Sequence, residues 1–287
     1  MSVGLITRFK NERHIMYEWF HHHLKEGVDK FYFIDDHSDD DFLKENSWLL
    51  DYVKNGKVKL LKSKSGQHKD YDNFLGMIKK ENKWIIQIDI DEFIFNPYPK
   101  MGIKELLNKY LNKYDYIRVK WKLFSHRCAE QPKSVIENNV ITHKEEIDPT
   151  SLVGIKCIGK TRFLKSIDIH KMSFGRMVKT LELFNSHNKF LQLNHYRTQS
   201  DEYLFGIKEQ RGDGIGNIVK YKKPDNRHKK FNKVCLLLKN KRSVLIEACN
   251  EREQVKPNIY KNSSWFKKME NRQEKKEETE IQVLSNS

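Results

Sequence analysis

The chain lacks a hydrophobic run long enough to cross a bilayer. Among its 287 residues the longest apolar runs, such as residues 234–238, have only the length of a strand. The apolar stretch near the N-terminus is too short for the hydrophobic region of a signal peptide, and charged residues follow it directly. Proline and glycine are scarce, at 6 and 13 residues, which excludes a collagen-like or low-complexity chain. We therefore expect a soluble, cytoplasmic globular protein, either free or peripheral to a membrane.

Paired cysteines are lacking as well. The spacing of the cysteines is wide and contains no Cys-x-x-Cys pair, which argues against a zinc ribbon and against a disulfide framework. The pattern is typical of a reducing compartment. The four cysteines are Cys128, Cys157, Cys235 and Cys249.

Positive charge is in excess. The formal net charge is +15, and residues 221–233 and 239–242 carry much of it. Such a surface favours anionic partners, which include nucleic acid, an anionic membrane surface and a nucleotide-bearing small molecule. An ordinary solvated basic face explains the same charge equally well.

The first 35 residues predict a βαβ unit. Residues 3–9 have the pattern of a strand, residues 10–29 that of a helix, and residues 30–35 that of a second strand. Asn11 is the expected N-cap of the helix and Gly27 its C-terminal stop. Strand, helix and strand at this spacing imply parallel pairing with a right-handed crossover.

The alternation continues, and it predicts an α/β fold with a mixed, mostly parallel sheet flanked by helices. Ligands bind such sheets at the carboxyl ends of the strands. We expect one domain over residues 1–220 and a basic, charged, helical extension over residues 221–287, with a solvated or frayed tail. The expected later elements are helices at 39–54 and 71–81, strands at 57–63, 84–93 and 115–124, mixed strands and loops at 125–195, and helix from Ser200.

Residues 84–93 (WIIQIDIDEF) place three acids in one of the most apolar runs. An unpaired buried carboxylate is costly, so either this run ends at solvent or a positive partner faces the acids. If the run is one strand, Asp89 and Asp91 share a face and Glu92 lies on the other. Two carboxylates at the end of a buried parallel strand suit Mg²⁺ or Mn²⁺. An exposed strand end with acids of no special role remains the alternative.

A second acidic group, residues 35–41, follows the second strand. Asp36 and Ser38 there are placed to reach a ribose or a base edge, as acids in this position do in nucleotide-binding folds. The alternative is a helix N-terminus, where acids are stabilised by the helix dipole.

Three ordered motifs carry a resemblance to a known family. They are residues 7–41 (TRFKNERHIMYEWFHHHLKEGVDKFYFIDDHSDDD), residues 84–95 (WIIQIDIDEFIF) and residues 193–212 (LNHYRTQSDEYLFGIKEQRG). Together they resemble nucleotide-sugar transferases of the GT-A fold, closest to glycosyltransferase family 92 (the former domain of unknown function 23) and its family 2-like relatives.

The resemblance implies a metal-dependent transferase that moves a sugar from a UDP-sugar to a hydroxyl of a glycan or glycoconjugate, with inversion. Galactose is the sugar that characterised members often use. In such enzymes the aspartate pair, here Asp89 and Asp91, holds Mn²⁺ or Mg²⁺ on the donor diphosphate, and His195 matches the histidine that completes the metal shell. The residues implied in donor binding are Thr7, Arg8, Asn11, Glu12, Asp36, Lys208 and Arg211.

The catalytic base is left open among four acids. The family's Gly- and Ser-rich turn near the acceptor is replaced here by residues 125–132 (SHRCAEQP), which contain His126. His170 matches a late family histidine only loosely and is interpreted as structural. His21 to His23 are consecutive on a helix and cannot converge on one metal ion. The candidate bases are Glu130, Asp168, Asp201 and Glu202.

Two other functions and one further partner fit parts of the sequence. Residues 221–242 could bind nucleic acid, although only two aromatic side chains lie there. A metal-dependent phosphoesterase would use acids and histidines too, but it needs a denser set of metal ligands. The same basic segment could contact an anionic membrane surface.

Overall fold

The structure of the chain is a computed structural model. It describes residues 2–64, 67–98, 100–126, 128–142, 154–184, 190–211 and 238–254. Most of the basic segment 221–242, the tail beyond residue 254 and Cys235 lie outside the described residues. The predictions made for them are therefore untested. None of the described helices is both long enough and apolar enough to span a membrane.

A ten-stranded mixed sheet forms the centre of the described part. The strand order is β3-β2-β1-β4-β8-β6-β12-β5, and β11 and β7 both pair with β6. Pairing is parallel from β3 through β4 and between β6 and β12, whereas β8, β5 and β7 pair antiparallel with their neighbours. The strands are β1 (Val3–Phe9), β2 (Lys30–Asp35), β3 (Val58–Lys62), β4 (Trp84–Gln87), β5 (Glu92–Phe95), β6 (Tyr116–Ser125), β7 (Ile141–Thr142), β8 (Ile155–Lys160), β11 (Thr180–Leu183) and β12 (Gln192–His195).

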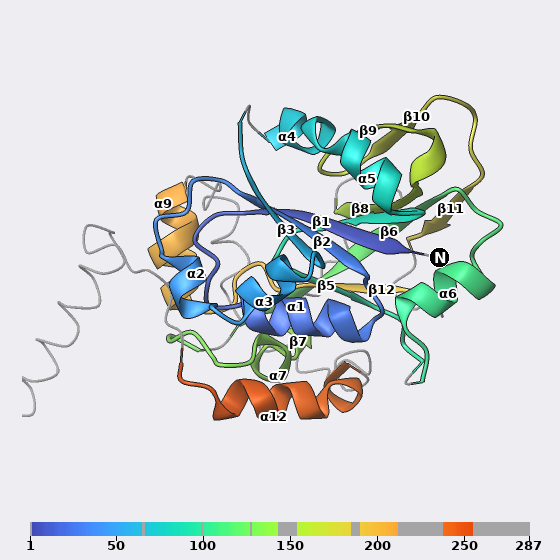
Figure 1. Cartoon of the computed structure of the whole chain (residues 1–287). Coiled ribbons are helices and arrows are strands. Elements are labelled where there is room, and N and C mark those ends of the chain that lie inside the picture. The colour runs from blue at the N-terminus through green and yellow to red at the C-terminus, as the bar shows by residue number, and fades with distance from the viewer. Residues whose placement is uncertain are drawn as a thin grey trace, which may run out of the picture.

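Helices cover both faces of this sheet. Figure 1 shows α1, α7 and α12 on one side and α4 and α5, with the separate hairpin of β9 (Leu164–Ile167) and β10 (Met172–Phe174), on the other. Alternation along the strands creates the two cores: Phe31 and Phe33 face one side, and Tyr32 and Ile34 the other. The helices are α1 (Met16–Lys25), α2 (Phe42–Glu45), α3 (Leu49–Lys54), α4 (Gln67–Asn73), α5 (Leu75–Glu81), α6 (Ile103–Lys109), α7 (Val135–Asn138), η1 (Thr161–Phe163), α8 (Asp201–Tyr203), η2 (Leu204–Lys208), α9 (Glu209–Arg211) and α12 (Ser243–Glu251).

The predicted fold class is confirmed, and the first βαβ unit is present with a shorter helix. Gly27 ends α1 with φ 93°, a conformation that favours glycine. The predicted N-cap is wrong, because α1 begins at Met16 and Asn11 lies earlier, at φ 57°. Asn11 instead joins two loops: its N–H donates to Ser38 Oγ, and its Oδ1 accepts from Asp39 N.

Two predicted helices are each interrupted. The helix expected at 39–54 is α2 and α3, separated at Asn46, whose Nδ2 donates to the Phe42 carbonyl that ends the first of them. The helix expected at 71–81 is α4 and α5.

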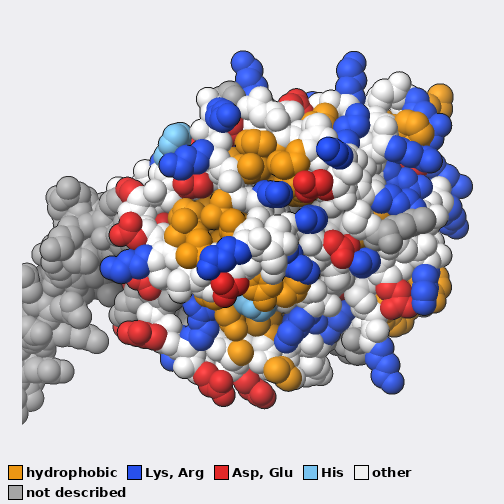
Figure 2. Space-filling view, in the orientation of Figure 1, with side chains coloured by type: hydrophobic (Ala, Val, Ile, Leu, Met, Phe, Trp, Pro, Cys, Tyr) orange, Lys and Arg blue, Asp and Glu red, His pale blue; other side chains and the backbone are white. Residues whose placement is uncertain are grey.

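Figure 2 shows Lys and Arg side chains spread over one face of the molecule with Asp and Glu between them.

Residues 84–93 are not one strand, and this prediction is wrong. The chain leaves β4 after Gln87, turns through residues 88–91 and enters β5, which pairs with β12 instead of continuing beside β1. The Glu92 N–H donates to the Asp89 carbonyl at 3.1 Å, and Trp19 Nε1 donates to the carbonyls of both residues, at 2.8 Å for Glu92 and 3.2 Å for Asp89. The turn is thus fixed by a core tryptophan of α1.

The described C-terminal residues pack onto α1. Arg242 donates through Nε to His22 Nδ1 at 3.0 Å and pairs with buried Glu26, which Lys241 also reaches at 2.8 Å. The ring of His22 donates to the Ile94 carbonyl of β5, so the histidine tract is structural in this region, as expected. The boundary predicted at residue 220 falls among residues that the structure does not describe.

Candidate active site

A cleft of about 470 Å³ opens at the carboxyl ends of β1, β2 and β4. The end of β1, the residue after β2 and the turn after β4 all contribute to it, and β12 and the α8–α9 segment close the far side. Its lining mixes cations and acids, as a site for a charged polar ligand would. The lining residues are Arg8, Phe9, Lys10, Glu12, Asp36, Asp89, Ile90, Asp91, Trp121, His170, His195, Arg197, Lys208 and Arg211.

Asp91 is the buried centre of the cleft. Its Oδ2 lies 2.7 Å from Lys208 Nζ and its Oδ1 lies 3.3 Å from His195 Nε2. Burial alone would raise the pKa of Asp91, but Lys208 and His195 outweigh it and hold that pKa well below its usual range. Burial lowers the pKa of His195, so its ring is neutral at pH 7. The cleft therefore presents one firmly ionised carboxylate between a lysine and a neutral imidazole.

Asp89 faces a different cation. Its Oδ2 lies 2.7 Å from Nζ of Lys156, a lysine of β8 whose side chain is 1% exposed. The same Nζ lies 3.7 Å from Glu92, which is fully buried. The expectation that Glu92 points away from Asp89 is wrong, since both carboxylates share Lys156. The reason is the turn after β4, which ends the strand alternation on which that expectation depended.

Lys156 was missed by the sequence reasoning, although a signal was present. It lies in VGIKCIG, residues 153–159, where a lysine interrupts a run with no other charged residue. The burial argument that singled out Asp89 applies equally to a lysine, because a buried ammonium needs a carboxylate partner. The apolar run that carries the acids, residues 84–93, and the apolar run that carries Lys156 lie side by side, because β4 pairs with β8.

Most of the expected donor-binding residues line the cleft, whereas Thr7 and Asn11 do not. Arg8 pairs with Asp36 at 2.6 Å and lies 3.4 Å from buried Asp70, which holds its guanidinium at the cleft floor. Thr7 is buried and does not line the cleft, and neither does Asn11, which ties the loop after β1 to the loop after β2.

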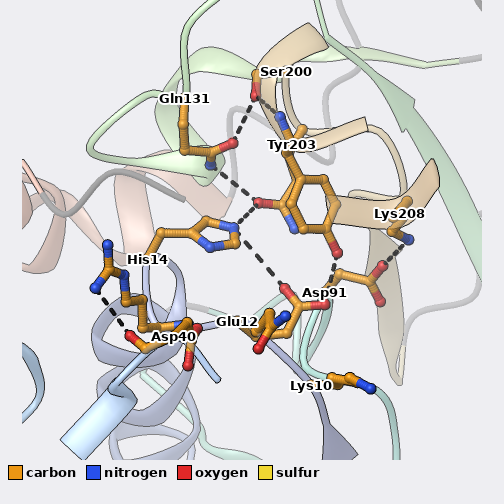
Figure 3. A network of polar contacts seen from close by, with 12 residues as sticks. Lys10, Glu12, His14, Asp40, Asp91, Gln131, Ser200, Tyr203 and Lys208 are labelled. Atoms are coloured by element: carbon orange, nitrogen blue, oxygen red, sulfur yellow. Dashed lines mark hydrogen bonds and ion pairs between the residues drawn. The ribbon is translucent and has the colours of Figure 1, made fainter. Parts of the chain in front are cut away.

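A polar network joins the two walls of the cleft (Figure 3). Glu12 Oε1 accepts from Tyr203 Oη at 2.7 Å and from Arg211 at 2.8 Å. Ser200 Oγ caps the following helix by accepting from Tyr203 N, and it donates to Gln131 Oε1. Burial raises the pKa of Glu12 to about 7. The network fixes α8 and its continuation, and hence Lys208, against the loop after β1.

None of the four candidate bases lines the cleft. Glu202 is buried and accepts from Gln131 N at 2.8 Å, and Asp201 pairs with His126 at 3.1 Å. Asp168 accepts from the neighbouring Ile169 N–H in the turn between β9 and β10. Glu130 is exposed near the start of the loop before α7.

One aromatic side chain that the sequence reasoning did not select, Trp121, also lines the cleft. Trp121 of β6 lies between two histidine rings, with centroids 4.4 Å from His195 and 5.8 Å from His170. Gly154, at φ 78°, leaves room for this indole: a Cβ there would lie 2.2 Å from Trp121 Nε1. His170 therefore lines the cleft, and its Nδ1 bond to the Ile155 carbonyl of β8 also gives it the structural part that the sequence suggested.

The donor set at Asp91 is suited to a divalent cation. Two ligands about 2.1 Å from one ion, at right angles, lie about 3 Å apart, and Asp91 Oδ1 and His195 Nε2 are separated by 3.3 Å. Asp89, the third expected ligand, is turned to Lys156. In the described part of the chain no three acids, histidines or cysteines converge on one point. The pair fits a metal ion, and Asp89 completes a set of three only by leaving Lys156.

Comparison with known sequences identifies the family. The profile of glycosyltransferase family 92 matches residues 5–282, nearly the whole chain. The chain belongs to glycosyltransferase family 92. The resemblance read from the three motifs is thereby confirmed, and the chain is a glycosyltransferase. A comparison with curated proteins found no match to this chain.

Two solved structures are similar to the chain at low sequence identity. The family 92 chain is similar to TarS of S. aureus (residues 1–349, in complex with UDP), with 16% identity, a TM-score of 0.42, and coverage of 68% of this chain and 60% of TarS. It is also similar to GalNAc-T7 with UDP, GalNAc and Mn²⁺, with 12% identity, a TM-score of 0.42, and coverage of 86% and 57%. The chain thus spans less than two thirds of either structure.

Proposed function

We propose that the chain transfers a sugar from a UDP-sugar to a hydroxyl of a glycan or glycoconjugate. The observation that carries the proposal is the cleft at the carboxyl ends of β1, β2 and β4, where Asp91 lies between His195 and Lys208. A nucleoside diphosphate brings negative charge, and the cleft supplies several cations near one another. TarS and GalNAc-T7 have been solved with UDP, in agreement with this donor.

In this proposal the donor lies with its nucleoside over the loop after β1 and its diphosphate toward Asp91. Arg8 and Asp36, paired at 2.6 Å, face the ribose and base, and buried Thr7 and Asn11 support them from beneath. Lys208 and Arg211 neutralise the diphosphate. Glu12, bound to Tyr203 and Arg211, orients the second of these cations.

Asp91 and His195 would hold Mn²⁺ or Mg²⁺, with Asp89 as a further ligand. When bound, the ion neutralises the charge that develops on the leaving nucleoside diphosphate. Mn²⁺ in the GalNAc-T7 structure agrees with this choice. The chain's own part is to keep Asp91 ionised and His195 neutral, which are the forms that bind a metal.

The direct test is a screen of UDP-sugars for UDP release, with and without Mn²⁺ or Mg²⁺, starting with UDP-galactose. We expect turnover of at least one donor and its loss in Asp91→Asn, while Asp51→Asn, an exposed acid of α3, behaves as wild type. Equal turnover in Asp91→Asn would reject the metal assignment. Analysis of the product anomer tests inversion.

The other two functions gain nothing from the described residues. The nucleic-acid hypothesis depends on residues 221–242, most of which lie outside the described part. A phosphoesterase with two metals needs more ligands than the described cleft brings together. Contact of the basic segment with an anionic membrane remains a prediction.

A further inference from the structure

We propose that His170 is the general base that deprotonates the acceptor hydroxyl. This inference depends on the proposed transferase function, and it replaces the four acids that the sequence suggested. It starts from the cleft lining: His170 and His195 are its histidines, and His195 already faces Asp91. A base for the acceptor must lie in the cleft and have a free lone pair.

Each carboxylate of the cleft has a cation close by, which assigns it to the charge balance of the cleft. A nearby positive charge lowers the basicity of a carboxylate. Burial raises the pKa of Glu12 to about 7, but its side chain is buried and its Oε1 is held by Tyr203 and Arg211. The pairs are Asp36 with Arg8 at 2.6 Å, Asp89 with Lys156 at 2.7 Å, Asp91 with Lys208 at 2.7 Å, and Glu12 with Arg211 at 2.8 Å.

The tautomer of His170 is fixed by the fold. Nδ1 lies 3.0 Å from the Ile155 carbonyl of β8, and a carbonyl can only accept, so Nδ1 carries the hydrogen. Nε2 therefore holds the lone pair, and it points away from Ile155. Among the residues that the structure describes, no group bonds Nε2. His170 is exposed and lines the cleft, so this nitrogen is open to a substrate.

The surroundings of His170 keep the ring neutral and still tolerate its protonation. Partial burial of the ring lowers the pKa of His170 and Lys156 lowers it further, so the base form prevails at pH 7. Asp89 and Asp168 act in the opposite direction and stabilise the imidazolium once it forms. Trp121 packs against the ring edge with an interplanar angle of 84° and limits its rotation.

The reaction step balances without a further reagent. The acceptor oxygen forms a bond to the anomeric carbon, and the bond from that carbon to the phosphate oxygen breaks with its electron pair, which leaves on UDP. The acceptor proton moves to Nε2 of His170. The imidazolium then releases the proton to water, which restores the base.

The test is UDP release from the UDP-sugar that wild type turns over in the screen, UDP-galactose first, in His170→Asn. The asparagine amide can still donate to the Ile155 carbonyl but offers no base. We expect kcat to fall about 10²- to 10⁴-fold, with the Kd for UDP unchanged. Lys171→Met, an exposed neighbour in the same turn, is the matched control and should keep wild-type kcat.

Further readouts separate a base from a structural residue. In His170→Ala, added imidazole should restore part of kcat, and the acidic limb of the wild-type pH profile should be absent. A kcat within threefold of wild type in His170→Asn, or a loss that follows Asp168→Asn instead, would overturn the assignment. So would equal losses of UDP affinity and kcat. If wild-type protein neither binds UDP nor turns over any donor, the proposed function fails and this inference with it.

Discussion

Replacing Lys156 with methionine tests the charge arrangement beneath the cleft. Methionine keeps most of the volume and apolar contact of the lysine stem, so the substitution removes the ammonium without opening a large cavity. Lys156 is 1% exposed and lies 2.7 Å from Asp89 and 3.7 Å from Glu92. Its loss leaves a fully buried glutamate with no cation of its own.

The magnitude follows from burial and distance. At an effective dielectric constant of about 20, an ion pair at the Lys156–Glu92 distance is worth roughly 4 kcal/mol when Glu92 is ionised. Burial raises the pKa of Glu92 well above its usual value even beside Lys156, and this favours the neutral form and makes the pair worth less. The interaction of Lys156 with Asp89 contributes less to stability, because the Asp89 side chain is 34% exposed and water screens its charge. Removing one partner of a buried pair typically costs about 3–5 kcal/mol, and we expect Lys156→Met to lose about 3 kcal/mol at pH 7. Burial raises the pKa of Glu92 far above its usual value, so protonation reduces this cost at lower pH.

Urea denaturation at pH 7 and pH 5, followed by tryptophan fluorescence, measures the effect. Lys165→Met on β9 is the matched control, since Lys165 is exposed and the same substitution should change the free energy of unfolding by less than about 0.5 kcal/mol. In Lys156→Met/Glu92→Gln part of the stability should return. A loss below about 1 kcal/mol at pH 7, or a loss that grows toward pH 5, would refute the reasoning.

Three further predictions address the core, the cleft wall and the donor. His23 is fully buried, and burial lowers its folded pKa to about 3. The folded state stays neutral while the unfolded state takes up a proton below about pH 6.5, so the free energy of unfolding falls as the pH falls. In denaturation experiments His23→Gln should therefore cost about 2 kcal/mol less at pH 5 than at pH 7. An unchanged cost would contradict this. Gly154→Ala should displace Trp121 and lower both stability, by about 2 kcal/mol or more, and turnover, whereas Gly76→Ala in α5, with nothing within 4 Å of the added Cβ, should be neutral or stabilising. Lys208→Met should raise the calorimetric Kd for UDP about 10- to 100-fold, with exposed Lys62→Met as control; equal affinities would remove Lys208 from the donor site.

Much of the fold and part of the site could be predicted from the sequence. The strand–helix–strand alternation is a local pattern, and the carboxyl ends of parallel strands meet at one edge, so Arg8, Asp36 and Asp91 were expected near one another and do line one cleft. His195 was placed by resemblance alone, since nothing in its local pattern connects it with Asp91.

The rest depended on tertiary contacts that local pattern does not encode. The break after Gln87 is imposed by Trp19, which lies far away in sequence and binds both carbonyls of the turn. The same break brings Glu92 to Lys156. His170 had only a loose match to a family motif, and it reaches the cleft because the β9–β10 turn folds back over β8, where the Ile155 carbonyl holds its ring.

The melting temperature with UDP and Mn²⁺ tests the central claim, that this cleft binds the nucleoside diphosphate of a sugar donor. At a ligand concentration 100 times Kd, binding adds about 2.7 kcal/mol. For a domain of this size that corresponds to a rise of about 5–10 °C. We expect such a rise for wild type and its loss in Asp91→Asn. No shift in wild-type protein with UDP or any other nucleoside diphosphate would show that this cleft does not bind the donor.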